Sequence, residues 1–178
     1  MIKINKKFYL VSFIVLGGLS VLLFLAGLLA GVEAPHYLVI YPSIIMFLIG
    51  LVFHYRAWKA IQDGTESTTP VKAVGFLFIP VYNLYWLFRT LEGFAKDFNS
   101  YKIGHQIEAK DLPEGLYFFQ CVLIILMVVL LRFEAEWLVY PTLAVMLWVY
   151  INTLVIISKS ANAVNAIYES QGSSAADE

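Results

Sequence analysis

The sequence predicts an all-α integral membrane protein whose four transmembrane helices form two hairpins around a cytoplasmic segment. Of its 178 residues, 60% are hydrophobic and only 14% are charged, and the mean hydropathy is +0.75. Soluble domains average about 45–50% apolar and about 25% charged residues. With one cysteine and a net charge of −1, the composition excludes a disordered chain, a disulfide scaffold and a basic nucleic-acid-binding surface.

Four apolar runs supply the expected spans, all within one membrane domain covering residues 1–178. About 20 apolar residues cross a hydrocarbon core of roughly 30 Å. The first run follows three lysines and is longer than the apolar part of a signal peptide, so we expect an uncleaved anchor rather than a removed leader. The third run is short, and we expect it to gain a helical turn. The runs are 8–31, 37–58, 115–131 and 137–158.

A fifth apolar stretch, 73–91, permits three topologies: spanning, re-entrant or interfacial. The distribution of Lys and Arg discriminates between them, because cytoplasmic loops are enriched in these residues. If the stretch does not span, 11 of the 12 Lys and Arg residues are cytoplasmic and only Arg132 is outside; if it spans, they divide 7 to 5. The sequence therefore predicts four spans, with both termini in the cytoplasm of a bacterial inner membrane.

The cytoplasmic segment 70–101 reads as a helix, a break and a second helix. Thr69 followed by Pro70 is a helix start, and Pro80 ends the first helix near residue 78. The second helix, 81–101, is amphipathic, and we expect it to lie in the inner interface with Tyr82, Tyr85 and Trp86 at headgroup depth. Its apolar face comprises Leu84, Leu87, Phe88, Leu91, Phe94, Ala95, Phe98 and Tyr101.

Two interpretations of this segment remain open. It is either a hairpin that lines a site or docks a partner, or an amphipathic helix that covers the inner ends of the spans. Under the first, the candidate docking or entrance residues are Arg56, Pro80, Asn83, Tyr85, Trp86 and Arg89.

The ends of the second hairpin also carry helix signals. Asp111 and Glu114 flank Pro113 and predict a capping box at the start of the third span. After the fourth span, the stretch 159–178 predicts a helix that continues into the cytoplasm and ends in a frayed tail.

Polar residues inside the spans form the main candidate site. Ser12, His54, Gln120 and Asn152 each lie a few residues from the inner end of their span. They either bond across helices or form a polar pocket open to the cytoplasm. Separately, Gly27 and Gly31 form a GxxxG pattern that favours close helix packing within the bundle or in a dimer.

The sequence offers little for catalysis. The three histidines, His36, His54 and His105, are too far apart in sequence and depth to share a metal, and Cys121 has no evident base nearby. None of the four spans contains Asp, Glu or Lys. We therefore expect no cofactor, no metal and no enzymatic activity.

The stretch TTPVKAVGFLFIPVYNLYWLFRTLEGFAKDFNSY resembles a family of uncharacterised bacterial multi-spanning membrane proteins. Members of that family carry a TTP, KAVGFLFIP and NLYW block after the second span and are sometimes fused to a GYF-like domain. The resemblance covers residues 58–101 and implies a membrane location but no particular activity.

These observations predict a non-enzymatic accessory or scaffold subunit that contacts the lipid bilayer and docks a protein partner through segment 70–101. The alternative is a small homo-oligomeric protein for transport, permeation or lipid handling. A membrane enzyme is the third and least supported class. The sequence gives no reason to expect nucleic acid as a partner.

Overall fold

The computed structural model describes residues 3–31, 38–133 and 136–174, and all regular secondary structure in these ranges is helical. By length and composition, three helices are able to cross a membrane: Lys6–Gly27, Ile40–Ala60 and Tyr140–Ser170. A fourth apolar helix, Glu114–Leu130, is shorter. The predicted all-α class is therefore confirmed, and the three candidate spans are compatible with a membrane protein.

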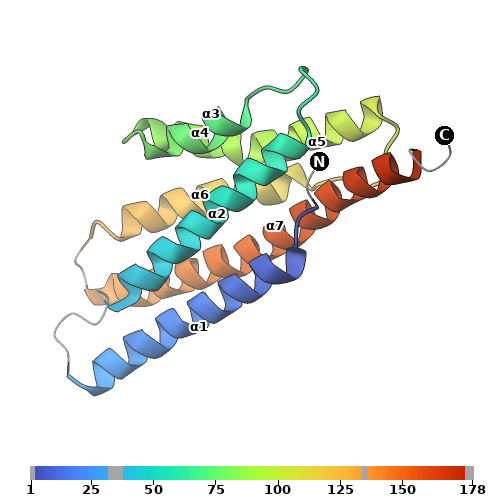
Figure 1. The fold of residues 1–178 in the computed structure, drawn as a ribbon. Helices are drawn as coiled ribbons and strands as arrows, with labels where there is room; N and C mark the ends of the chain where they lie inside the picture. The colour runs from blue at the N-terminus through green and yellow to red at the C-terminus, as the bar shows by residue number, and fades with distance from the viewer. Residues whose placement is uncertain (1–2, 32–37, 134–135, 175–178) are drawn as a thin grey trace.

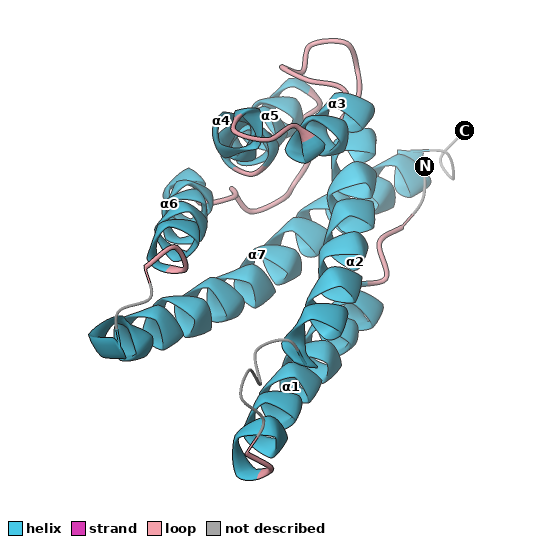
Figure 2. Ribbon diagram, turned by 90° about the vertical axis from the view of Figure 1, so that its left-hand side faces the viewer, coloured by secondary structure: helices cyan, strands magenta, loops and turns pink. Residues whose placement is uncertain are grey.

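The four predicted runs correspond to α1 (Lys6–Leu29), α2 (Ile40–Ala60), α6 (Glu114–Leu130) and α7 (Val139–Ser174). Helix α7 packs against α1, α2 and α6. Figure 2 shows α6 on one side of α7 and the α1–α2 pair on the other. The extra turn expected for the third span is absent, since α6 has 17 residues.

Helix α7 continues without a break to Ser174, as predicted for the residues after 158. Its last part binds the start of the chain. Asn165 Oδ1 accepts a hydrogen bond from Ile4 N at 2.9 Å, and Asn165 Nδ2 donates to Ile4 O at 3.0 Å. Lys3 forms an ion pair with Glu169 at 3.0 Å. Both termini therefore lie at the same end of the bundle, which we call the N/C end (Figure 1).

Burial is concentrated toward the N/C end. The largest fully buried side chains include Trp58, Tyr9, Tyr117, Phe94 and Phe98. Away from this end, the helices present apolar side chains outward: Leu22 is 66% exposed and Leu147 is 58% exposed. Contiguous exposed apolar surface of this kind requires cover by something other than water.

Between α2 and α6 the chain forms α3 (Pro70–Gly75), the 3₁₀ turn η2 (Phe76–Phe78), α4 (Tyr82–Thr90) and α5 (Glu92–Gly104). Thr69 is the N-cap of α3 as predicted: its Oγ1 accepts from Lys72 N at 3.3 Å. Before Pro80, Ile79 is extended, with φ −86° and ψ 113°, so the predicted break is also confirmed.

The expected single helix over 81–101 is wrong. It is divided at Leu91, where ψ is −67°. At this junction the indole Nε1 of Trp58 donates to Thr90 O at 3.0 Å. A side-chain donor on a helix carbonyl competes with the backbone ladder and bends the helix. The change of direction brings Phe94 against Trp58, with their ring centroids 5.7 Å apart.

The predicted capping box at the third span is also wrong. The N-cap of α6 is Pro113, which has no side-chain cap, and Asp111 pairs with Lys102 instead. The side chain of Asn99, in α5, binds the backbone just before α6. Its Oδ1 accepts from Leu112 N at 2.8 Å and its Nδ2 donates to Leu112 O at 2.9 Å. A tertiary contact thus replaces a local cap.

The GxxxG prediction for α1 is not supported as a helix face. Gly27 is buried, but α1 ends at Leu29 and Gly31 adopts φ +67° with open space around it. The close approach occurs at Gly17, where a Cβ would lie 2.6 Å from the Tyr150 ring. The Tyr150 hydroxyl also donates to Phe13 O at 3.2 Å.

The Asn165 contact yields a stability prediction. Replacing Asn165 with Ala removes both hydrogen bonds to Ile4, whose side chain is 1% exposed. We expect a loss of about 1–3 kcal/mol in the free energy of unfolding, because Ile4 N loses its partner and Ile4 O keeps only the bond from Lys6 N. Unfolding in detergent, followed by circular dichroism, measures the change. The matched control is Asn162→Ala, which removes only an exposed bond to Lys6; equal losses in the two variants would contradict the prediction.

Candidate functional site: a helical hairpin beside α2

Helices α3 and α4 form a hairpin that is tied together by side-chain donors to backbone carbonyls. Trp86 Nε1 donates to Lys72 O at 2.8 Å, and Thr90 Oγ1 donates to Ala73 O at 2.6 Å. Trp86 is 8% exposed and Thr90 is 1% exposed. Lys72 O also accepts from Phe76 N, so the Trp86 bond gives this carbonyl a second donor and ties the six-residue α3 to α4.

Aromatic side chains fill the space between the two arms. The rings of Tyr82 and Trp86 are stacked at 5.5 Å between centroids, and the Phe76 ring meets Trp86 edge-on at 4.7 Å. At the tip, Val81 has φ +66°, an uncommon conformation for a β-branched residue. The turn is closed by Tyr82 N, which donates to Pro80 O at 2.7 Å.

The hairpin tip lies far along α2. The rings of Phe78 and Phe47 are 6.1 Å apart. Position 47 is 13 residues from the end of α2 at Ala60, which corresponds to about 20 Å of helix. The tip is also apolar and exposed, with Phe78 at 61%, Val81 at 82% and Tyr85 at 57%. The hairpin thus runs alongside more than half of α2 from its N/C end.

The amphipathic face of the segment packs inside the chain. Leu91, Phe94, Ala95 and Phe98 are buried in the main core together with Trp58. The predicted placement of this face in the membrane interface is therefore wrong for most of its residues, because the chain's own helices cover them, and only Leu84 stays exposed. Of the three aromatics expected at headgroup depth, Tyr82 and Tyr85 are exposed, whereas Trp86 points inward.

The six residues proposed for docking or entrance are not brought together. Pro80, Tyr85 and Arg89 are exposed on the hairpin, and Asn83 is half-buried. Arg56 lies beside the Tyr9 hydroxyl of α1 and therefore belongs to the opposite side of α2.

The structure joins the polar layer only in part. Gln120 of α6 donates through Nε2 to Thr153 Oγ1 at 2.9 Å and to Val149 O at 3.3 Å, so it bonds across to α7. Thr153 was not singled out from the sequence. Within the described ranges, no hydrogen bond joins any two of Ser12, His54, Gln120 and Asn152. Three buried polar atoms of the layer lack a hydrogen-bond partner: His54 Nδ1, Gln120 Oε1 and Asn152 Nδ2.

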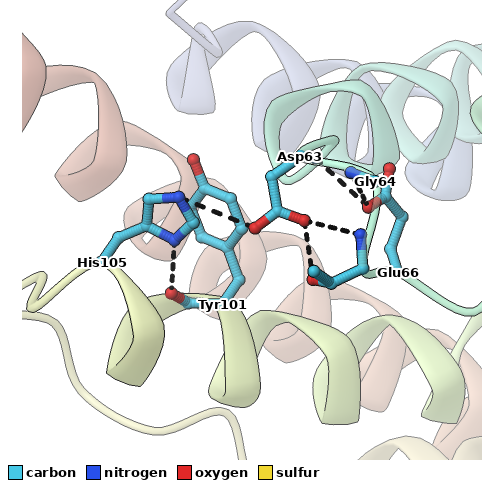
Figure 3. Close-up of polar contacts among 6 residues, drawn as sticks. Asp63, Gly64, Glu66, Tyr101 and His105 are labelled. Carbon is cyan, nitrogen blue, oxygen red and sulfur yellow. Dashed lines mark hydrogen bonds and ion pairs between the residues drawn. The ribbon is translucent and has the colours of Figure 1, made fainter.

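The loop before α3 is ordered by two carboxylates (Figure 3). Asp63 Oδ1 accepts from Thr65 N at 2.9 Å and from Thr65 Oγ1 at 2.6 Å, and Glu66 Oε2 accepts from Gly64 N at 2.7 Å. The Thr65 hydroxyl, followed by its backbone amide, holds the pKa of Asp63 below its ordinary value. Gly64 has φ +97°, so this turn favours glycine.

His105 approaches this loop from α5. Its ring stacks on Tyr101 with centroids 4.1 Å apart, and its Nε2 lies 3.6 Å from Asp63 Oδ2. Local sequence patterns do not predict this contact, because 42 positions separate the two residues. In the part of the chain that the structure describes, no three His, Cys, Asp or Glu side chains are placed to hold a metal ion. His36 lies outside the described residues.

A hollow of about 400 Å³ opens between this loop and the hairpin. Its polar part is formed by the loop and by Lys72 of α3, and its aromatic part by Tyr82 and Trp86. Thr68, which is 6% exposed, contributes a buried hydroxyl without a hydrogen-bond partner. The other lining residues are Gly64, Glu66, Ser67, Thr69 and Phe76.

The hydrogen bonds that join α4 to α3 predict a loss of stability when one of them is removed. Thr90→Val keeps the side-chain shape but removes the donor to Ala73 O. We expect unfolding to become easier by roughly 1–3 kcal/mol, since a buried carbonyl loses a partner. Ser100→Ala, an exposed substitution on α5, is the matched control. If Thr90→Val unfolds like the unmodified protein, the hairpin does not depend on this bond.

The hydrogen bonds of Asp63 in this loop predict that the stability of the fold decreases as the pH falls. Because the folded-state pKa of Asp63 is lowered, its ionised carboxylate stabilises the fold at neutral pH, and this contribution is lost as the pH falls through that pKa. Thr65→Val removes the largest cause and raises the pKa toward its ordinary value. A carbon-13 NMR titration of the carboxyl group measures it, with Ser67→Ala as the control. An unchanged titration in Thr65→Val would rule out this cause.

Comparison with protein-family models, with curated proteins and with solved structures gives no match for this chain. The resemblance of residues 58–101 to a bacterial membrane family therefore stays a prediction.

Proposed function

We propose that this chain is a non-enzymatic, four-span protein of the bacterial inner membrane that binds lipid of the inner leaflet through a re-entrant hairpin, residues 70–90. Lipid handling is one of the alternatives predicted from the sequence, and the proposal assigns it to one element, the hairpin. The observation that carries it is the contact between Phe78 at the hairpin tip and Phe47 within α2.

The position of the termini supports four spans. Residues 3–6 bond to residues 162–169, so the two ends of the chain meet at one end of the bundle. A chain whose ends meet on one side of a bilayer crosses it an even number of times. Helices α1, α2 and α7 together with the shorter α6 make four crossings, whereas a spanning 73–91 stretch would make five.

The depth of the tip supports a re-entrant hairpin. If α2 crosses the bilayer, its 21 residues match a core of roughly 30 Å. A tip about 20 Å along α2 then reaches beyond the middle of the core. An interfacial helix would contact only the end of α2.

The hairpin backbone suits an apolar environment. Unpaired backbone groups are costly in lipid, and non-helical backbone is tolerated there only where the protein satisfies it. Trp86 and Thr90 donate to carbonyls of α3, and the tip closes its own turn at Pro80 and Tyr82. The exposed side chains Phe78, Val81 and Tyr85 would face lipid.

The accessory-subunit proposal remains a second candidate, with a smaller surface than the sequence suggested. The apolar face on which it relied is buried against Trp58 and its neighbours. What remains exposed is Arg89 and the outward side of α4. Native purification in nanodiscs, with mass spectrometry of what is retained, tests it: a stoichiometric second protein supports docking, and a homo-oligomer carrying only lipid argues against it.

Spin labels measure the depth of the tip. We expect a label at Val81→Cys, in a Cys121→Ala background, to collide with oxygen and to be shielded from a water-soluble nickel complex, because the tip lies in hydrocarbon. A label at Ser67→Cys in the loop is the matched control and should show the reverse. Equal nickel accessibility at both sites would contradict the re-entrant hairpin.

A reporter fusion tests the number of spans. A reporter joined after Gly104, at the end of α5, is expected to read cytoplasmic, since 70–90 enters and leaves on the same side. A fusion after Ser158 gives the matched cytoplasmic reference. A periplasmic reading at Gly104 would restore the five-span topology.

A further inference from the structure

We propose that the hollow between the 64–69 loop and the hairpin binds the phosphoethanolamine headgroup of a zwitterionic phospholipid. The proposal rests on the proposed function, because the lipid reaches the hollow only if the hairpin enters the inner leaflet. It adds a binding site, a headgroup class and the residues that recognise it.

The hollow has a polar end and an aromatic end. Glu66, Thr68 and Lys72 line it at the loop, whereas Tyr82 and Trp86 line it toward the tip. Beyond Tyr82, the exposed apolar surface continues at the hairpin tip. A site that changes from polar to aromatic to apolar along its length matches a phospholipid, whose headgroup, glycerol and acyl chains follow the same order.

The size of the hollow fits one headgroup. Its volume of about 400 Å³ lies within the range of roughly 300–1,000 Å³ found for small-molecule sites. Aromatic rings beside a polar opening are typical of membrane–water interfaces, where one side of the ring is apolar and the other is wet.

The charges of the hollow favour a zwitterion. Its lining contains one cation, Lys72, and one anion, Glu66. Within the described ranges, Lys72 has no ion-pair partner and is available for a phosphate, while Glu66 can meet an ammonium group. A third charge lies close by: Asp97 Oδ2 accepts from Ser67 N at 2.7 Å. An anionic headgroup would therefore meet two carboxylates for a single lysine.

Thr68, in the wall of the hollow, carries an unpaired polar atom. Its side chain is 6% exposed, yet its hydroxyl has no hydrogen-bond partner. Buried polar groups are almost always paired, and leaving one unpaired costs free energy. The oxygen itself has almost no accessible surface, so pairing it with a phosphate oxygen requires the Thr68 side chain to rotate toward the hollow when the lipid binds.

Native mass spectrometry of the full chain in detergent tests the proposal. The chain is titrated with phosphatidylethanolamine and with phosphatidylglycerol of identical acyl chains. We expect retention of the first to exceed that of the second by about tenfold, the effect of one hydrogen bond to a charged group. Equal retention of the two lipids would overturn the zwitterionic site. Free O-phosphoethanolamine is a separate arm: saturation by it without any lipid adduct would assign the site to the soluble compound instead.

Variants separate binding from folding. Thr68→Val replaces the unpaired hydroxyl with a methyl group, so we expect unchanged or higher thermal stability together with weaker retention of phosphatidylethanolamine. Lys72→Gln should weaken retention by about tenfold, whereas Lys110→Gln, in the linker before α6, is the matched control and should not. Unchanged retention in both Thr68→Val and Lys72→Gln would overturn the site.

The spin-label experiment distinguishes the two possible failures. If Val81 lies in hydrocarbon but no lipid selectivity appears, the headgroup site is wrong and the re-entrant hairpin stands. If Val81 is as accessible to water as Ser67, the proposed function fails and the site fails with it.

Discussion

Three side-chain donors, Trp58 Nε1, Trp86 Nε1 and Thr90 Oγ1, bond to backbone carbonyls in and around the hairpin, and the arrangement of the N/C end depends on them. Short helices leave many carbonyls without backbone donors, and such groups are costly wherever water is excluded. Each of these bonds joins a carbonyl to a side chain of another element, and two of them fix the six-residue α3 in the bundle.

The same bonds explain why the core is asymmetric. Trp58 connects α2 to the junction of α4 and α5, and this brings Phe94 against Trp58 in the core that Phe98 also joins. The opposite halves of the helices have no inserted element and expose their apolar side chains. The hairpin therefore divides the molecule into a packed part that holds the hollow and a part whose surface is matched to lipid.

Much of this protein was predictable from local sequence. Apolar run length determined the four helices, because hydrophobic burial or lipid contact leaves few alternatives for such runs. The Thr69 cap and the Pro80 break were also predictable, since both act through bonds and sterics within a few residues. The continuation of α7 past residue 158 follows from its helix-forming residues alone.

Other features depended on partners that are distant in sequence. The bend at Leu91 requires the indole of Trp58, the start of α6 requires Asn99, and the Asp63–His105 contact joins positions 42 residues apart. The periodicity of 81–101 identified an apolar face but not what covers it, because lipid and protein side chains satisfy the same pattern. The sequence by itself determined which segments are helical and apolar; only the tertiary structure decided which faces are buried and where the hollow lies, since that choice depends on contacts between residues far apart in the chain.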